Sequence, residues 1–279
     1  MAESPNVCLT LSNQPDNVVL VREALSGIAD TVGVDELDLN DIRTAVTEAC
    51  NNVVLHAYEG DEGPLQVEVF VSPLAVEVVV RDHGTGIKPH IRSEQEAALG
   101  IGLSIIQALA PRVEFRDVPG GGTEVRMEFA AASAGALESP LHEGYQPPDV
   151  ARGELATTSA LAVAPSALAR KVLPRVMCVL AARAHFTTDR ISDTELVADA
   201  LVATAAAESA NAHLSMSISV EPRNLELRIG PLQDGHAERL VASTSLGGVG
   251  SAVERLISDH SVASGEGGEV LALQLRDER

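Results

Sequence analysis

The segment Glu48-Ala-Cys-Asn-Asn52, followed by His56-Ala-Tyr58, is the most informative part of this 279-residue chain. Three shorter segments follow it, in the order Asp82-His-Gly-Thr-Gly86, Gly100-Ile-Gly-Leu103 and Gly121-Gly-Thr123. Each segment alone is weak evidence. Together, with a helix, a strand pair, a loop and a strand predicted between them, they indicate a pocket for a nucleotide and its magnesium ion.

The first segment lies in a predicted helix at residues 38–57. Five apolar residues recur at helical spacing and define its buried face: Ile42, Ala45, Val46, Ala49 and Val53. Glu48, Asn52 and His56 are four residues apart, so they stack in a row beside that face. The amide oxygen of Asn52 suits Mg²⁺, and Glu48 can accept a proton from an attacking hydroxyl or water. An ordinary solvated helix edge is the alternative interpretation of this row.

The second segment follows a β-branched strand predicted at residues 75–82, which places the carboxylate of Asp82 at the edge of the core. An ionised Asp only accepts hydrogen bonds, so it suits the amino group of adenine. Gly84 and Gly86 lack Cβ, which lets the backbone turn sharply and a flat ring approach. A hairpin turn that uses Asp and Gly only for their torsion angles is the alternative.

The glycine pair Gly100 and Gly102, followed by Leu103, lies where a loop is predicted to become a helix at residues 100–110. Free amides and the dipole at a helix start favour phosphate, although a flexible helix entry would use the same glycines. Residues 87–99 are predicted to form a mobile lid over the phosphates. Thr123 opens the last strand, where its hydroxyl can bond the base or a water beside Asp82; a β-branched strand start is the alternative.

Composition limits the class of protein. Apolar residues make up 45% of the chain and aromatic residues 2%, so the cores should be aliphatic, and the length favours two domains. The formal charge of −20 without a basic block argues against direct nucleic-acid binding. The negative charge suits a partner protein with a basic patch; the alternative is that it only keeps the protein soluble. Three widely spaced cysteines, and no signal peptide or membrane span, predict a reduced cytoplasmic protein.

The chain also contains a hidden repeat. Residues 65–80 align without a gap to residues 214–229, and Gly121-Gly122 matches Gly267-Gly268. The breaker-rich stretch between the halves predicts domains at 1–132 and 157–279, with a linker at 133–156. We expect an α+β fold, a two-layer α/β sandwich with helices on one face of a largely antiparallel sheet, present twice in tandem. The first copy should contain strands at 6–12, 65–71, 75–82, 112–117 and 123–130, and helices at 17–31, 38–57 and 100–110.

The four segments, in this order, resemble the motifs of the ATP-binding domain shared by gyrase, Hsp90, histidine kinases and MutL, the GHKL superfamily. The resemblance is closest to the small anti-sigma-factor serine kinases, on His56-Ala57-Tyr58 and the short length. It covers residues 6–130 with good motifs and residues 160–276 only in outline.

This resemblance implies the role of each motif residue. Asn52 would hold Mg²⁺, Asp82 would bind the adenine amino group, Thr123 would support the base, and Glu48 would activate a serine hydroxyl on a partner. The residues that would shape the ATP pocket are Gly84, Gly86, Gly100, Gly102 and Leu103. Such kinases phosphorylate an anti-anti-sigma (STAS-type) protein and alternatively bind a sigma factor. Ala97-Ala98 stand where some relatives carry a basic residue, which leaves the efficiency of phosphotransfer open.

The second copy lacks these groups, since the gapless alignment sets Pro231 against Asp82 and Gln233 against Gly84. We therefore expect it not to bind ATP and to act as a built-in partner in an internal pseudo-dimer, with a homodimer as the alternative. Two other functions stay open: an ATP-gated binding protein without phosphotransfer, and a histidine kinase core. The latter requires a phosphoaccepting His on an upstream helical hairpin.

Overall fold

The computed structural model describes residues 4–85, 94–130, 141, 154–164, 166–208, 213–243, 252–265 and 268–278. The first half contains, in chain order, β1 (Val7–Ser12), α1 (Asn17–Val32), α2 (Glu36–Asn52), the π-helix η1 (Val53–Ala57), β2 (Pro64–Val71), β3 (Ala75–Asp82), α3 (Glu94–Leu109), β4 (Arg112–Asp117) and β5 (Thr123–Ala130).

The described residues of the second half form a similar series, with four α-helices where the first half has three and a π-helix. The elements of the second half are β6 (Thr158–Val163), α4 (Ser166–Arg183), α5 (Thr188–Glu208), β7 (Leu214–Glu221), β8 (Asn224–Leu232), α6 (His236–Ser243), α7 (Ala252–Leu256), β9 (Asp259–Gly265) and β10 (Gly268–Arg276). No helix within the described ranges combines the length and the apolar character needed to cross a lipid bilayer.

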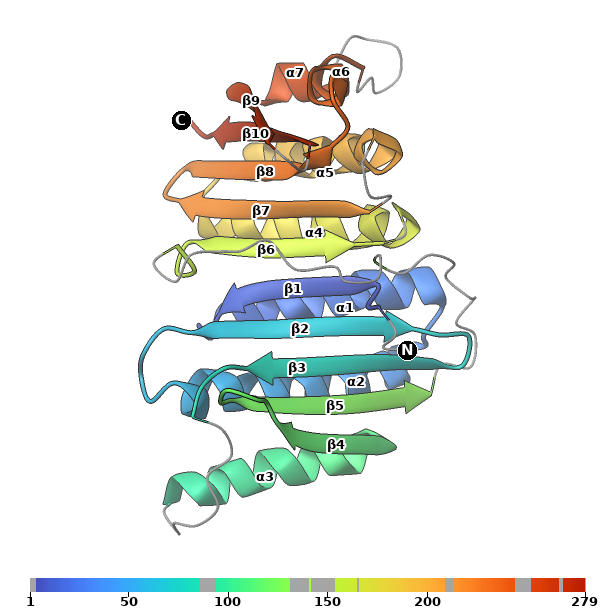
Figure 1. The fold of residues 1–279 in the computed structure, drawn as a ribbon, viewed down its shortest axis with the longest axis vertical. Helices are drawn as coiled ribbons and strands as arrows, with labels where there is room; N and C mark the ends of the chain where they lie inside the picture. Colours follow the sequence, from blue (N-terminus) through green and yellow to red (C-terminus); the bar gives the residue numbers. More distant parts are fainter. Residues whose placement is uncertain are drawn as a thin grey trace.

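The strands of both halves form one ten-stranded sheet in the order β4-β5-β3-β2-β1-β6-β7-β8-β10-β9. All neighbouring strands pair antiparallel. Figure 1 shows α1, α2, α4 and α5 on one face, with α3 at the β4 end of the sheet and α6 and α7 at the β9 end. The strand order is the same in both halves when it is read outward from the central pair β1 and β6. It is β1-β2-β3-β5-β4 in the first half and β6-β7-β8-β10-β9 in the second.

The prediction of an α+β fold with a large antiparallel sheet and helices is confirmed. All elements predicted for the first half are present, and the core consists mainly of Val, Leu, Ile and Ala side chains, as expected from the composition. Two features were not predicted. The helix expected at residues 100–110 begins earlier, at Glu94, and the halves share one sheet where separate sheets would also have satisfied the pattern.

The two halves meet along β1 and β6, which pair from Val7↔Val163 to Thr10↔Ala160. On the helical face, α1 and α4 cross at Gly27, where a Cβ atom would lie 2.5 Å from the carbonyl oxygen of Lys171. Because any side chain would strike the α4 backbone, this crossing requires glycine. The Arg183 side chain donates to Asn17 Oδ1 over 2.7 Å, which adds a polar contact between the same helices.

The opposite face of this seam is covered by Leu141. Its side chain is 1% exposed and packs with Cys8, Ala162 and Ala164, and its amide donates to the Pro5 carbonyl over 2.8 Å. The segment expected as a linker therefore contributes a buried residue to the junction. Burial of a leucine side chain contributes about 2 kcal/mol.

The start of α2 is fixed by local chemistry. Gly33, with φ of +75°, ends α1, and the side chain of Asp35 accepts hydrogen bonds from the amides of Leu37 and Asp38, each over 2.9 Å. This is the expected N-cap arrangement. It sets the helical phase that brings Glu48 and Asn52 to one side of the helix.

Candidate functional site

The polar row on α2 lies where the sequence predicted it. The stripe of Ile42, Ala45, Val46, Ala49 and Val53 is buried against the sheet. Glu48, Asn52 and His56 are half-buried beside it. A carboxylate and an amide thus stand one turn apart at the edge of the core, an arrangement that we call the α2 shelf. Oxygen groups of this kind can bind a hard cation that keeps most of its waters.

The α2 shelf ends against the turn that follows β3. The helix widens into η1, and the Ala57 carbonyl accepts a hydrogen bond from the Thr85 amide over 2.9 Å. Gly84 lies so close that a Cβ atom on it would be 2.0 Å from the same carbonyl oxygen. Asn52 precedes Ala57 by five residues, or about 7 Å along the axis. The metal-binding candidate and the Asp82 turn therefore occupy one end of the sheet.

Asp82 is 4% exposed at the end of β3. Its Oδ1 accepts the Gly84 amide over 2.8 Å, and the amide and hydroxyl of Thr123 also favour the charged carboxylate. Burial raises the pKa of Asp82 above the usual value, and the hydrogen bonds from Gly84 and Thr123 offset part of that rise. The carboxylate is an acceptor held in one orientation, and Thr123 lies beside it. The predicted bond from the Thr123 hydroxyl to the base or to a water stays a prediction.

The glycines of the last motif allow β5 to approach this turn. Gly122 has a φ of +108°, and a Cβ atom at this position would be 2.1 Å from the Asp82 carbonyl oxygen. Any other residue would be strained there and would separate β5 from β3. The glycine therefore brings Thr123 within reach of Asp82.

Tyr58 is a residue to which the sequence analysis gave no role. Its hydroxyl accepts from the His83 amide over 2.9 Å and donates to the Pro64 carbonyl over 2.6 Å. The side chain thus connects the end of η1 to the Asp82 turn and to the start of β2. The position of Tyr58 directly after His56-Ala57 was the only signal in the sequence, and it indicates a structural contribution to the site.

The glycine pair does not lie at a helix start, which corrects the prediction. Gly100 and Gly102 are inside α3, so their amides belong to a helix that already began at Glu94. A Cβ atom at Gly102 would lie 3.1 Å from Glu48 Oε2 and 3.5 Å from Asn52 Oδ1, so α3 packs directly on the α2 shelf. Leu103 is half-buried beside it. Gly86 and the lid residues 87–93 lie outside the described residues, and residues 94–99 are helical.

In the second half, a bulge shifts the predicted alignment by one residue. The gapless correspondence holds as far as Ile229, which pairs with Leu271 as Val80 pairs with Val125. One extra residue in β8 then brings Leu232 opposite Glu269. Gly268, with φ of +124°, approaches the Leu232 carbonyl oxygen as Gly122 approaches that of Asp82. Leu232, and not Pro231, is therefore the counterpart of Asp82.

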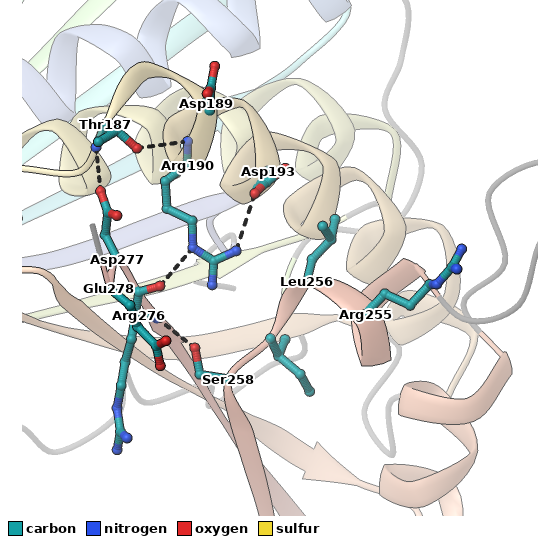
Figure 2. A pocket seen from close by; sticks show the side chains of 11 residues that line it. Thr187, Asp189, Arg190, Asp193, Arg255, Leu256, Ser258, Arg276, Asp277 and Glu278 are labelled. Atoms are coloured by element: carbon teal, nitrogen blue, oxygen red, sulfur yellow. Dashed lines mark hydrogen bonds and ion pairs between the residues drawn. The ribbon is translucent and has the colours of Figure 1, made fainter.

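A separate cavity of about 390 Å³ lies in the second half, lined by residues from the start of α5, the α7–β9 turn and the end of β10. Its polar groups bond to one another (Figure 2): Arg190 donates to the Arg276 carbonyl and to Asp193, and Asp277 accepts the Thr187 amide. The side chains of Arg255 and Arg276 point away from Arg190. None of the four motif segments lines this cavity.

Comparison with known proteins agrees with the motif segments. Residues 11–129 match the family model of the histidine kinase-like ATPase domain. An anti-sigma F factor from Thermoanaerobacter sp. (strain X514) is 30% identical over 128 residues, covering 43% of this chain and 89% of that protein. This chain belongs to the anti-sigma and serine-kinase branch of the histidine kinase-like ATPases.

Other members of this branch show the same extent of similarity. A serine-protein kinase RsbW from Bacillus licheniformis is 32% identical over 113 residues, covering 36% of this chain and 71% of the relative. An anti-sigma F factor from Pasteuria penetrans is 38% identical over 121 residues, covering 38% and 81%. The family therefore accounts for the first half of the chain and includes ATP binding among its properties.

Proposed function

We propose that this protein is a cytoplasmic anti-sigma regulatory factor with protein serine/threonine kinase activity. It uses Mg-ATP to phosphorylate a serine of an anti-anti-sigma (STAS-type) partner, and it alternatively binds a sigma factor. The observation that carries the proposal is the single polar region formed by the α2 shelf and the Asp82 turn, which meet where Gly84 packs on Ala57. The family relationship of residues 11–129 supports it.

The nucleotide would lie between these two groups. Asp82 would accept a hydrogen bond from the adenine amino group, with Thr123 beside the base and Gly84 and Gly86 forming the turn that a flat ring can approach. Gly100, Gly102 and Leu103 would border the phosphates. Two hydrogen bonds hold this turn: the Gly84 amide donates to Asp82 Oδ1, and the His83 amide donates to the Tyr58 hydroxyl.

Two residues would serve the transfer itself. Asn52 would place its amide oxygen on Mg²⁺, which when bound neutralises charge on the transferring phosphoryl group. Glu48, one turn away, would orient the serine hydroxyl and accept its proton. The Glu48 side chain is half-buried at the edge of the core.

A direct test combines labelled ATP, Mg²⁺ and a candidate anti-anti-sigma protein with wild-type, Glu48→Ala or Asp82→Asn chain. We expect acid-stable phosphoserine on the partner with wild type, and loss of label with Glu48→Ala although ATP still binds. Asp82→Asn should weaken nucleotide binding itself. Absence of label with wild type on every such partner would contradict the kinase proposal.

A second candidate function is an ATP-gated binding protein without phosphotransfer. The packing of Gly102 on Glu48 favours it, because α3 then restricts access to that carboxylate. In that case nucleotide would change partner affinity, and Glu48→Ala would leave this change intact. Phosphoserine that depends on Glu48 would exclude this alternative.

The domain organisation is also part of the proposal. The matching strand order of the halves and their register up to Ile229 support a tandem duplication with domains at 1–132 and 157–279. The side chain of Leu232 offers no acceptor to a purine amino group, so the second copy would have lost its nucleotide site. The shared sheet at β1–β6 and the α1–α4 crossing would make it a built-in partner of the first copy.

A further inference from the structure

The second half contains a carboxylate whose position the proposed function leaves unexplained. Glu269, in β10, accepts a hydrogen bond at Oε2 from the backbone amide of Ala237 over 3.1 Å. This amide lies in the first turn of α6, which begins at His236. The start of a helix attracts an anion, and here a side chain of the same chain supplies it.

The position of Glu269 is equivalent to that of Thr123. Each residue directly follows a glycine with positive φ, Gly122 or Gly268. Gly122 packs on the carbonyl of Asp82 at the end of β3, and Gly268 packs on the carbonyl of Leu232 at the end of β8. In the first half, the residue at this position favours the charged form of a neighbouring carboxylate, Asp82. In the second half the relationship is reversed: the carboxylate is on β10, and an apolar residue ends β8.

We propose that Glu269 is an internal ligand of the second half, whose carboxylate occupies the place beside the third strand that the first half offers to an external nucleotide. The comparison with the first half rests on the proposed nucleotide site, whereas the role of Glu269 on α6 does not. The clamp holds α6 in one position whether or not nucleotide is present.

The properties of α6 agree with this role. It has eight residues, fewer than an isolated helix needs for stability in water, so it depends on contacts at its ends and on its apolar face. Ala237 and Leu240 are fully buried, which fixes that face. The backbone amides of Gly235, Ala237 and His236 lower the pKa of Glu269, as expected for an anion that the helix start stabilises.

Hydrogen exchange of the full chain, followed by mass spectrometry, tests the clamp. Glu269→Thr introduces the first-half residue, and Glu269→Gln keeps the shape but removes the charge. We expect amides of 235–243 to exchange about tenfold faster in Glu269→Thr, and less so in Glu269→Gln, with β7 and β8 unchanged. Glu226→Gln is the matched control, because that half-buried carboxylate pairs with Arg228 on β8 and should leave α6 unchanged.

Two results would overturn the proposal: unchanged exchange of 235–243 in both Glu269 variants, or wild-type protection of α6 that depends on Mg-ATP. Titration with a fluorescent ATP analogue adds the stoichiometry, expected to be one per wild-type chain. Binding of two per chain would also contradict the internal ligand. Binding of none would contradict the proposed function of the first half, while the exchange experiment would still decide the role of Glu269.

Discussion

Gly102 of α3 lies directly against Glu48 of α2, so that a methyl group at position 102 would stand 3.1 Å from Glu48 Oε2. This contact brings the third motif to the α2 shelf although the glycine pair lies inside a helix. The absence of a side chain at Gly102 therefore leaves Glu48 and Asn52 in their observed positions. Gly102 also destabilises α3, because glycine is a poor helix former.

Gly102→Ala should consequently separate stability from activity. Alanine in the helix interior should raise the free energy of unfolding by up to about 1 kcal/mol. The same methyl group should displace the Glu48 carboxylate and lower the rate of phosphotransfer about tenfold or more. Urea unfolding and single-turnover phosphorylation measure the two effects. Gln107→Ala, at an exposed position of the same helix, should leave the transfer rate unchanged; a parallel loss there would mean that α3 acts through its overall stability.

Asp82→Asn should weaken Mg-ATP binding without destabilising the fold. Loss of a hydrogen bond to a charged acceptor corresponds to about 10- to 100-fold in affinity. Burial raises the pKa of Asp82, so the ionised form is held at a cost in the folded protein, and stability attributable to this group falls as the pH rises. The neutral amide removes that cost. In Asp82→Asn, the affinity for Mg-ATP measured by nucleotide titration should therefore fall, whereas the temperature of thermal unfolding should rise or stay unchanged. Asp117→Asn serves as the exposed control.

Much of this site could be predicted because its signals are local. Helical spacing from Ile42 to Val53 fixed the buried face of α2, and hence the edge on which Glu48 and Asn52 stand. Strand alternation and a terminal Asp placed Asp82 at the edge of the core. The close approaches of Gly84 and Gly122 follow from the same motifs, since only glycine tolerates those contacts.

The remaining features depend on contacts between distant segments, which a linear pattern does not encode. α3 begins at Glu94, whereas Gly100 and Gly102, inside the helix, gave the opposite local signal. The extra residue in β8 follows a stretch, up to Ile229, that aligns with the first half without a gap. It makes Leu232, and not Pro231, the residue that corresponds to Asp82. Glu269 lies in an ordinary strand pattern, and only the fold brings its carboxylate to the start of α6.

The sheet face opposite the helices carries a charge pair that should make stability depend on acid pH. Arg81 Nη2 lies 2.7 Å from Glu124 Oε2, on neighbouring strands β3 and β5. Burial alone would raise the pKa of Glu124, but the hydrogen bond and charge of Arg81, with Arg126 and Arg116, lower it overall. The stabilisation is therefore present at neutral pH and is lost as the pH falls below about 4.3, through the lowered pKa.

Glu124→Gln should remove this part of the acid sensitivity. Urea unfolding at pH values from 7 to 3 should show a loss of about 1 kcal/mol at pH 7 and a smaller difference from wild type at pH 3. Glu62→Gln, at an exposed loop position, gives the background effect of removing one carboxylate. A difference between Glu124→Gln and wild type that stays constant with pH would show that packing, and not charge, is responsible.

The α1–α4 crossing tests whether the second half supports the first. A Cβ at Gly27 would lie 2.5 Å from the Lys171 carbonyl oxygen and 2.9 Å from the Val172 Cα, both backbone atoms that cannot move aside alone. Gly27→Val should therefore cost about 1–3 kcal/mol in the free energy of unfolding. If the second half acts as a built-in partner, ATP affinity should fall as well, although position 27 is not one of the motif residues.

Asp30→Ala is the control. It removes an exposed ion pair with Arg175 in the same helix pair, so it should cost less than about 1 kcal/mol and leave ATP binding intact. Unchanged ATP affinity in a destabilised Gly27→Val chain would mean that the first half binds nucleotide without help from the second.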